Sequence, residues 1–327
     1  MKNVSAYSLF VFVVSLFQAI DATQDYSKMS VEQLDAALIV AVKSMSYHDV
    51  AQLIQAGAHV NQKITYTKSN YDDYDSIITC SLVEYAAGRG YLDVVQVLVQ
   101  ADIPTQDLDC ALVESALGGY EDVVAALVQT KVSVNGMNDA LMVTAYNFYG
   151  QSYSLGIMQT LIKAGAQVNA KGWHDDTVLM MALRNSPYRN ASFRNDIIAD
   201  RKESRIELIR FLLQTKVDVN MSNYIGDTAL MVAIKNHDFD IVQLLLQVPG
   251  ININHANHDG NTACMIAIQS IRFTYIQGNQ EQYDHCVNSQ EIFDLLLQFP
   301  DVDYLHVNKK GDTAVSMLNK LLGDMDR

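Results

Sequence analysis

The sequence predicts an all-α fold in which pairs of helices, joined by turns, stack side by side. The first observation is a short string that recurs along the second half of the chain as TVLMMAL (177–183), TALMVAI (228–234) and TACMIAI (262–268). The second is an apolar block that follows each string, namely LIRFLLQ (208–214), IVQLLLQ (241–247) and IFDLLLQ (292–298). The third is a closing string, such as VDVN at 217–220. Strings that return in the same order indicate a repeat protein.

The first half of the chain carries fainter copies of the same unit. Residues 81–102 read SLVEYAAGRGYLDVVQVLVQAD, and residues 110–131 read CALVESALGGYEDVVAALVQTK. Apolar residues at helical spacing cover one face of two short helices in each copy, and a single pair of such helices cannot bury that face, so the copies must stack. We place copies, the last of them partial, near residues 36, 81, 110, 139, 177, 228, 262 and 313.

The repeated unit resembles the ankyrin repeat. That family has a glycine turn, T-P-L-H-x-A-A, a second helix of the form G-x-x-x-V-V-x-x-L-L, and a G-A-x-V-N exit such as LIQAGAHVN (53–61) and LIKAGAQVN (161–169) here. The resemblance covers residues 31–327 and implies an all-α ankyrin-repeat solenoid of helix-turn-helix units with short β-hairpin fingers. Valine or alanine replaces the proline of the family pattern, and Met180, Met231 and Met265 replace its histidine.

The first 22 residues are predicted to be a signal peptide. Lys2 precedes the apolar run LFVFVVSLF (9–17), and the small residues Ala19 and Ala22 offer a cleavage point. The apolar run is too short for a membrane span, which needs about 20 residues. We therefore expect export to the periplasm or the medium and no membrane span in the mature chain.

The charge of the chain argues against nucleic acid as a partner. The formal net charge is −14 and the pI is about 4.8. Proteins that bind nucleic acid neutralise phosphates with lysine and arginine, which this composition does not favour. The sequence also contains no local motif of a catalytic or phosphate-binding site, so we expect no cofactor and no enzyme activity.

Four insertions interrupt the regular spacing of the copies. One, at 62–79, lengthens the connection between the first and second copies, and three, at 146–155, 185–203 and 271–288, separate the two helices of a copy. Those three are rich in aromatic residues or arginine and are predicted to be loops on the edge opposite the fingers. Such loops are either a binding edge or self-packed decorations, and the sequence leaves both open. Between the second and fourth copies, the connections are short enough to predict simple turns instead of fingers.

The resemblance implies a second candidate surface, on the fingertips and the first-helix face. The positions that usually contact partners in ankyrin proteins are occupied here by Trp173, His174, Arg184, Tyr224, Ile225, Lys235, His258, Asp259, Lys309 and Lys310. Trp173 is the only tryptophan of the chain. An exposed aromatic at a tip favours recognition of a partner.

Several cysteines and histidines resemble metal ligands. The stretch 252–268 contains His255, His258, Asp259 and Cys264, which are zinc-ligand types. The repeat register directs Cys264 into the core and the tip residues His258 and Asp259 toward solvent, so we predict no metal site. The adjacent pair His285–Cys286 lacks spaced partners. A disulfide between Cys80 and Cys110, at similar points of adjacent copies, is left open.

The predicted function is therefore binding of another protein, a host protein if the chain is secreted by a bacterium. The alternatives are an enzyme or enzyme-accessory protein with a site among the insertions, and a structural element whose insertions only pack.

Overall fold

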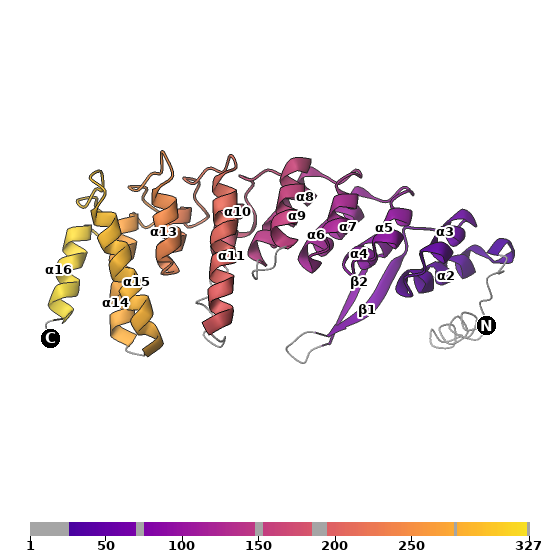
Figure 1. Cartoon of the computed structure of the whole chain (residues 1–327), viewed down its shortest axis with the longest axis horizontal. Helices are drawn as coiled ribbons and strands as arrows, with labels where there is room; N and C mark the ends of the chain where they lie inside the picture. The colour runs from indigo at the N-terminus through magenta and orange to yellow at the C-terminus, as the bar shows by residue number, and fades with distance from the viewer. Residues whose placement is uncertain (1–25, 70–74, 148–152, 185–194, 278–279, 326–327) are drawn as a thin grey trace. The chain divides into compact units, whose positions relative to one another are not determined.

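A computed structural model of the chain describes residues 26–69, 75–147, 153–184, 195–277 and 280–325 (Figure 1). The chain divides into two compact units, Met1–Ala140 and Leu141–Arg327. The predicted signal peptide, 1–22, lies outside the described residues. Within the described residues, no helix combines the length and the apolar character needed to cross a membrane.

The first unit consists of helix pairs and one β-hairpin. Its elements are η1 (Tyr26–Lys28), α2 (Val31–Lys43), α3 (Tyr47–Gln55), β1 (Lys63–Ser69), β2 (Asp75–Ser81), α4 (Leu82–Ala87), α5 (Leu92–Leu98), α6 (Thr105–Gly118), α7 (Glu121–Leu127) and the start of α8 (Val134–Tyr146). The helices pair as α2–α3, α4–α5 and α6–α7. The first helices of neighbouring pairs contact one another, and so do the second helices, which produces two layers.

The apolar faces predicted from helical spacing form the core of this unit. The buried side chains of α4 and α5 include Leu82, Tyr85, Ala86, Val94, Val95 and Leu98. Ser81 begins α4 with a capping box, in which its hydroxyl accepts from the Glu84 N–H and the Glu84 carboxylate accepts from the Ser81 N–H. This arrangement satisfies two backbone donors that the helix itself leaves free. The connections at 99–104 and 128–133 are short, as predicted.

The insertion at 62–79 is a β-hairpin, a structure that the spacing argument did not predict. Strands β1 and β2 pair antiparallel, with Ile64 opposite Cys80 and Tyr66 opposite Ile78. Ile64 and Cys80 are buried, whereas Ile77 on the other face is 77% exposed. Because side chains alternate between the faces of a strand, one face of the hairpin packs on α4 and the other faces solvent.

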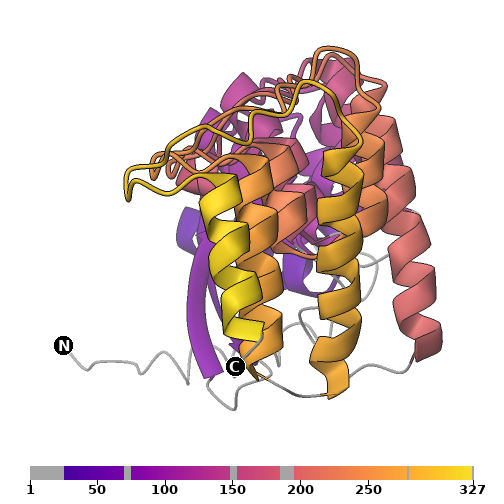
Figure 2. The same cartoon turned by 90° about the vertical axis from the view of Figure 1, so that its left-hand side faces the viewer.

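The second unit has a two-layer arrangement of the same kind. Its elements after α8 are α9 (Tyr153–Ala164), η2 (Trp173–Asp175), α10 (Val178–Arg184), α11 (Asn195–Leu213), α12 (Ala229–Lys235), α13 (Phe239–Leu246), α14 (Ala263–Gln277), α15 (Gln280–Leu297) and α16 (Ala314–Met325). The first helices α10, α12, α14 and α16 contact in sequence, and the second helices α11, α13 and α15 do the same (Figure 2). The alanines predicted to allow close helix approach, among them Ala182, Ala233 and Ala267, are buried.

A buried ion pair joins neighbouring pairs of helices in this unit. Arg205 on α11 donates to the carboxylate of Asp238 (Nη1 to Oδ2, 2.8 Å) and to the carbonyl oxygens of Ala182 and Leu183 at the end of α10. Both side chains of the ion pair are almost completely buried. Arg205 thus satisfies carbonyl groups that a helix leaves without a partner at its C-terminus.

The prediction that the inter-helix insertions are loops is wrong for the parts that the structure describes. Residues 195–203 belong to α11, and residues 271–288 extend α14 and α15 except at 278–279, which lie outside the described residues. Figure 1 shows α11, α14 and α15 projecting away from the finger edge. The described extra residues therefore lengthen helices instead of forming loops. The side chains of 185–202 and 272–287 lie outside the described residues, so the aromatic and arginine-rich edge stays a prediction.

The cysteines that the structure describes carry free thiols. Cys80 and Cys264 are buried and Cys110 is half-buried, and none of the three forms a disulfide. The disulfide that the sequence left open between Cys80 and Cys110 is therefore not formed.

Candidate partner-binding surface

Each finger of the second unit is a turn organised by one asparagine. The string N-x-x-G-(D/N)-T occurs at 223–228, 257–262 and 308–313. In the middle finger, Asn257 Oδ1 accepts from the backbone N–H groups of Asp259 and Asn261, both at 3.0 Å. The glycine of this finger, Gly260, has a φ of +77°, a conformation that favours glycine over other residues.

Hydrogen bonds connect these fingers into a ladder. The asparagine Nδ2 of each finger donates to a side-chain oxygen of the preceding finger: Asn223 to Asp176 (3.0 Å), Asn257 to Asp227 (2.9 Å) and Asn308 to Asn261 (2.8 Å). The backbones are joined as well, at 3.0 Å each, from Tyr224 N to His174 O, from His258 N to Ile225 O and from Lys309 N to Asp259 O. We call this set of bonds the finger ladder. It fixes the spacing and order of the fingertips.

Two of the predicted contact residues form ion pairs with carboxylates that accept hydrogen bonds of the finger ladder. Arg184 forms an ion pair with the buried carboxylate of Asp176, and Lys235 does so with that of Asp227. The hydrogen bond to Asp176 raises the pKa of Arg184 above its usual value. These cations compensate buried carboxylates, which would otherwise be costly to desolvate.

The other predicted residues lie on the tips. We define the tip surface as Trp173, His174, Tyr224, Ile225, His258, Asp259, Lys309 and Lys310. The Trp173 side chain is 66% exposed and that of Tyr224 is 53% exposed. The rings of His174 and Tyr224 lie 5.1 Å apart between centroids, at an interplanar angle of 38°. His258, Asp259, Lys309 and Lys310 are also exposed. The bonding order of the ladder places an aromatic group at one end of the tip surface and two lysines at the other.

The last finger adds two exposed apolar side chains that the sequence analysis did not select. Leu305 is 73% exposed and Val307 is 59% exposed, and they lie four and two residues before Lys309. The family positions that guided the selection begin only four residues before the threonine, and both residues precede them. Leu305 ends the closing string VDYL (302–305) and Val307 lies in the finger that follows. Two apolar residues so close to a fingertip are the signal that would have found them.

The apparent zinc ligands separate as predicted. Cys264 is buried in α14, and burial raises the pKa of its thiol to about 11. His258 and Asp259 face solvent, and His255 Nε2 lies 3.0 Å from the Gly226 carbonyl oxygen. Over the part of the chain that the structure describes, no group of three or more histidine, cysteine or acidic side chains is arranged to hold a metal ion.

Comparison with known proteins gives one family. The family model described as "Ankyrin repeats (many copies)" matches residues 198–246, which include most of α11 together with α12 and α13. No curated protein matches the chain. Ankyrin repeats generally mediate protein–protein interaction and are typically not catalytic. The helix pairs and this match together identify the fold as all-α and ankyrin-like.

Proposed function

We propose that this protein binds another protein through the tip surface of its second unit. The observation that carries the proposal is the exposure of Trp173 and Tyr224 on fingers whose backbones are already bonded to their neighbours. Aromatic side chains contribute strongly to binding when a partner covers them, and tryptophan and tyrosine are the types enriched at binding hot spots. A surface fixed before binding also loses little conformational entropy when the partner arrives.

The order of side chains along the tip surface indicates the chemistry of the partner. The aromatic end, around Trp173 and Tyr224, suits an apolar patch. The other end presents Lys309 and Lys310 beside the exposed Leu305. A partner with an apolar patch followed by acidic side chains would complement both ends.

The test is an affinity capture with the chain lacking residues 1–22, compared with the double variant Trp173→Ala and Tyr224→Ala. The double variant should lose most of the captured partner, with the dissociation constant rising about thirtyfold or more, because hot-spot residues contribute about 2 kcal/mol or more. The double variant Tyr47→Ala and Ile77→Ala removes comparably exposed apolar side chains from the first unit and serves as control. If the tip variant captures the same partner as well as the control does, the tip surface is not the binding surface.

We further infer that the protein is exported to the periplasm or the medium, where a host protein is a candidate partner if the source is a bacterium. The support is the predicted signal peptide at 1–22. Mass spectrometry of the N-terminus of the protein recovered outside the cytoplasm should find Thr23 as its first residue. An intact Met1 in all of the protein, recovered from the cytoplasm, would contradict this inference.

The edge that carries the insertions is the other candidate binding surface. An enzyme or enzyme-accessory site among the insertions is the alternative function. Deletion of 185–194 distinguishes both alternatives from the tip surface. If the tip surface binds the partner, this variant should capture the partner as the unchanged protein does.

A further inference from the structure

A pocket in the first unit lies beneath the hairpin and has no role in the proposed function. Its volume is about 320 Å³, and its lining residues come from β1, β2, α4, the turn after α4, and α6: Tyr66, Thr67, Ile78, Cys80, Glu84, Tyr85, Gly88, Arg89 and Glu114. The hairpin belongs to the 62–79 insertion, so this pocket is formed by a segment that the regular repeat does not require. All of the lining residues belong to the same compact unit.

One side of the pocket is a cation held by aromatic rings. The guanidinium carbon of Arg89 lies 4.0 Å from the ring centroid of Tyr85 and 4.8 Å from that of Tyr66. The two rings meet edge to face, with centroids 5.2 Å apart. Arg89 is therefore already engaged by cation–π contacts, which are favourable for guanidinium groups.

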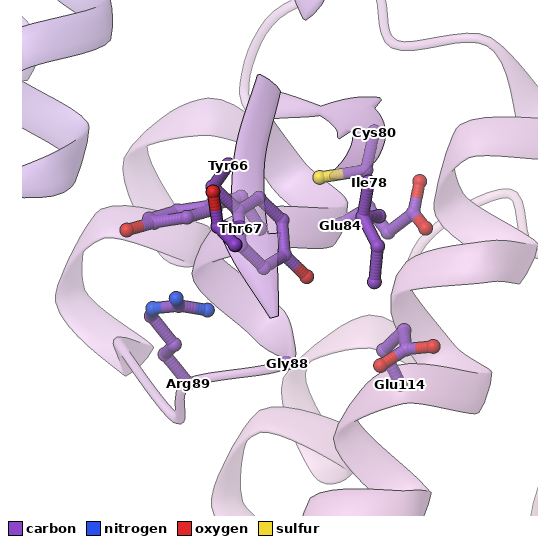
Figure 3. Close-up of a pocket in the computed structure, with 9 residues that line it drawn as sticks. Tyr66, Thr67, Ile78, Cys80, Glu84, Gly88, Arg89 and Glu114 are labelled. Carbon is purple, nitrogen blue, oxygen red and sulfur yellow. The ribbon is translucent and has the colours of Figure 1, made fainter. Parts of the chain in front are cut away.

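The other side of the pocket is lined by two carboxylates, those of Glu84 and Glu114. Figure 3 shows Glu84 and Glu114 across the pocket from Arg89 and Tyr66. Among the described residues, Glu84 and Glu114 form no ion pair, and the only hydrogen-bond partner of the Glu84 carboxylate is the Ser81 N–H, at 3.4 Å. Burial raises the pKa of Glu84, and Glu114 and Asp107 add to this increase, whereas the hydrogen bond from Ser81 and the charge of Lys63, which lies beyond ion-pair distance, oppose it. Among the residues that line the pocket, two carboxylates thus face a single guanidinium, while the nearby Lys63 lies outside the lining.

The wall between the two sides is apolar and partly buried. Ile78 and the Tyr66 ring contribute to it, and Cys80, which is 4% exposed, directs its free thiol into the pocket. Burial raises the pKa of Cys80 to about 12, with smaller contributions from Glu84 and Glu114, so the thiol stays neutral. Because this wall is uncharged and the Cys80 thiol is free, the wall would accommodate an aliphatic chain.

We propose that this pocket binds an alkylammonium or alkylguanidinium group, with the charged end between Glu84 and Glu114 and the aliphatic stem along Ile78, Tyr66 and Cys80. The group can be the side chain of a lysine or arginine in a peptide, or a free amine of the same chemistry. A cation at this position would pair with two half-buried carboxylates, neither of which forms an ion pair among the described residues. An ion pair in a partly buried site is favourable when its geometry and hydrogen bonds compensate for the loss of water.

The test is isothermal titration calorimetry of the full chain with n-butylguanidinium and n-butylammonium, with the neutral 1-butanol as the matched probe. The cations should bind at least tenfold more tightly than 1-butanol. The variants Glu114→Gln and Glu84→Gln should each weaken binding of the cations about tenfold. Glutamine also serves in a capping box, so Glu84→Gln keeps the start of α4. Glu121→Gln, on the exposed first turn of α7, is the control and should bind as the unchanged protein does.

A second arm separates the two sources of the cation. A capped tripeptide Ala-Arg-Ala that binds more tightly than n-butylguanidinium assigns the pocket to a peptide side chain, and the opposite order assigns it to a free amine. Equal affinity for 1-butanol and the cations, or unchanged affinity in both glutamine variants, would overturn the proposal.

Discussion

Replacing Asn257 by aspartate changes a single donor in the finger ladder to an acceptor. In the present protein, Asn257 Nδ2 donates to Asp227 Oδ1 at 2.9 Å, while Asn257 Oδ1 accepts from two backbone N–H groups of its own turn. Aspartate retains the acceptor for those N–H groups. It loses the donor to Asp227 and places a second carboxylate against a buried one.

The expected cost follows from these two changes. A hydrogen bond to a charged group contributes about 1.5–3 kcal/mol. Two like charges about 4 Å apart repel by about 4 kcal/mol at an effective dielectric constant of about 20. The ion pair of Lys235 with Asp227 offsets part of this repulsion. We expect Asn257→Asp to lower the free energy of unfolding by about 3–5 kcal/mol at pH 7.

The chain contains a matched control for this substitution. Asn308 occupies the same place in the next finger, but its Nδ2 donates to the amide oxygen of Asn261, at 2.8 Å. The amide of Asn261 can rotate and present its own N–H group to a new carboxylate, so Asn308→Asp should cost about 1 kcal/mol or less. Both variants keep the side-chain oxygen that accepts from two backbone N–H groups of its turn, so the difference between their costs measures the effect of the facing group.

Urea unfolding, followed by circular dichroism and by the fluorescence of Trp173, measures both costs. Acid should reduce the penalty of Asn257→Asp, because protonation of one carboxyl removes the repulsion between the two. The carboxyl pair of the variant therefore takes up a proton more readily in the folded than in the unfolded state, and the folded state gains stability as the pH falls and this proton binds. Equal midpoints for the two aspartate variants at pH 7, or a penalty for Asn257→Asp that is the same at pH 4.5, would refute the reasoning.

Three further predictions concern packing and thiol chemistry. Arg205→Met should cost about 3–5 kcal/mol in urea unfolding because it removes one partner of a buried ion pair, and an unchanged midpoint would contradict this. Gly226→Ala should cost about 1–3 kcal/mol more than Gly311→Ala. Both glycines have positive φ, but of the two only Gly226 would place an added Cβ against the backbone nitrogen of the neighbouring finger, at 2.6 Å. Equal thermal midpoints of the two variants would contradict this, because they would show that the neighbouring finger moves away at no cost. Iodoacetamide at pH 8 should leave Cys80 and Cys264 unmodified in the folded protein, because burial raises their pKa to about 12 and about 11, and mass spectrometry should find both modified only after denaturation.

The stacked helix pairs could be predicted from the sequence because their signals are local. Helical spacing identified the buried face of α4 and α5, and recurrence of the strings identified the fingers. Cys264 could be assigned to the core in the same way, because its place in TACMIAI equals that of a leucine in TALMVAI. These assignments need only the position of a residue within its own repeat.

The hairpin and the helix extensions could not be predicted from the length of the insertions. The length of an insertion shows how many residues exceed the repeat period. It does not show whether those residues form a loop, a pair of strands or further helical turns. The signal for the hairpin was the alternation of apolar and polar residues in KITYT (63–67), which is typical of a strand with one buried face, together with the β-branched run IIT (77–79). The charged partners of Arg184 and Lys235 were missed for another reason. The repeat register shows which side of a helix faces the fingers. It does not show that a buried carboxylate lies within ion-pair distance of each cation, which requires the structure.

The tip surface and the hairpin pocket rest on different residues and different chemistry, and this separation can be tested. The tip surface relies on exposed aromatic side chains in the second unit, whereas the pocket relies on the carboxylates of Glu84 and Glu114 in the first. The double variant Trp173→Ala and Tyr224→Ala should therefore bind n-butylguanidinium as the unchanged protein does, and Glu114→Gln should capture the same partner through the tips. If Glu114→Gln instead abolishes partner capture while its helical content is unchanged, the partner itself supplies the cation, and the pocket is part of the protein-binding surface.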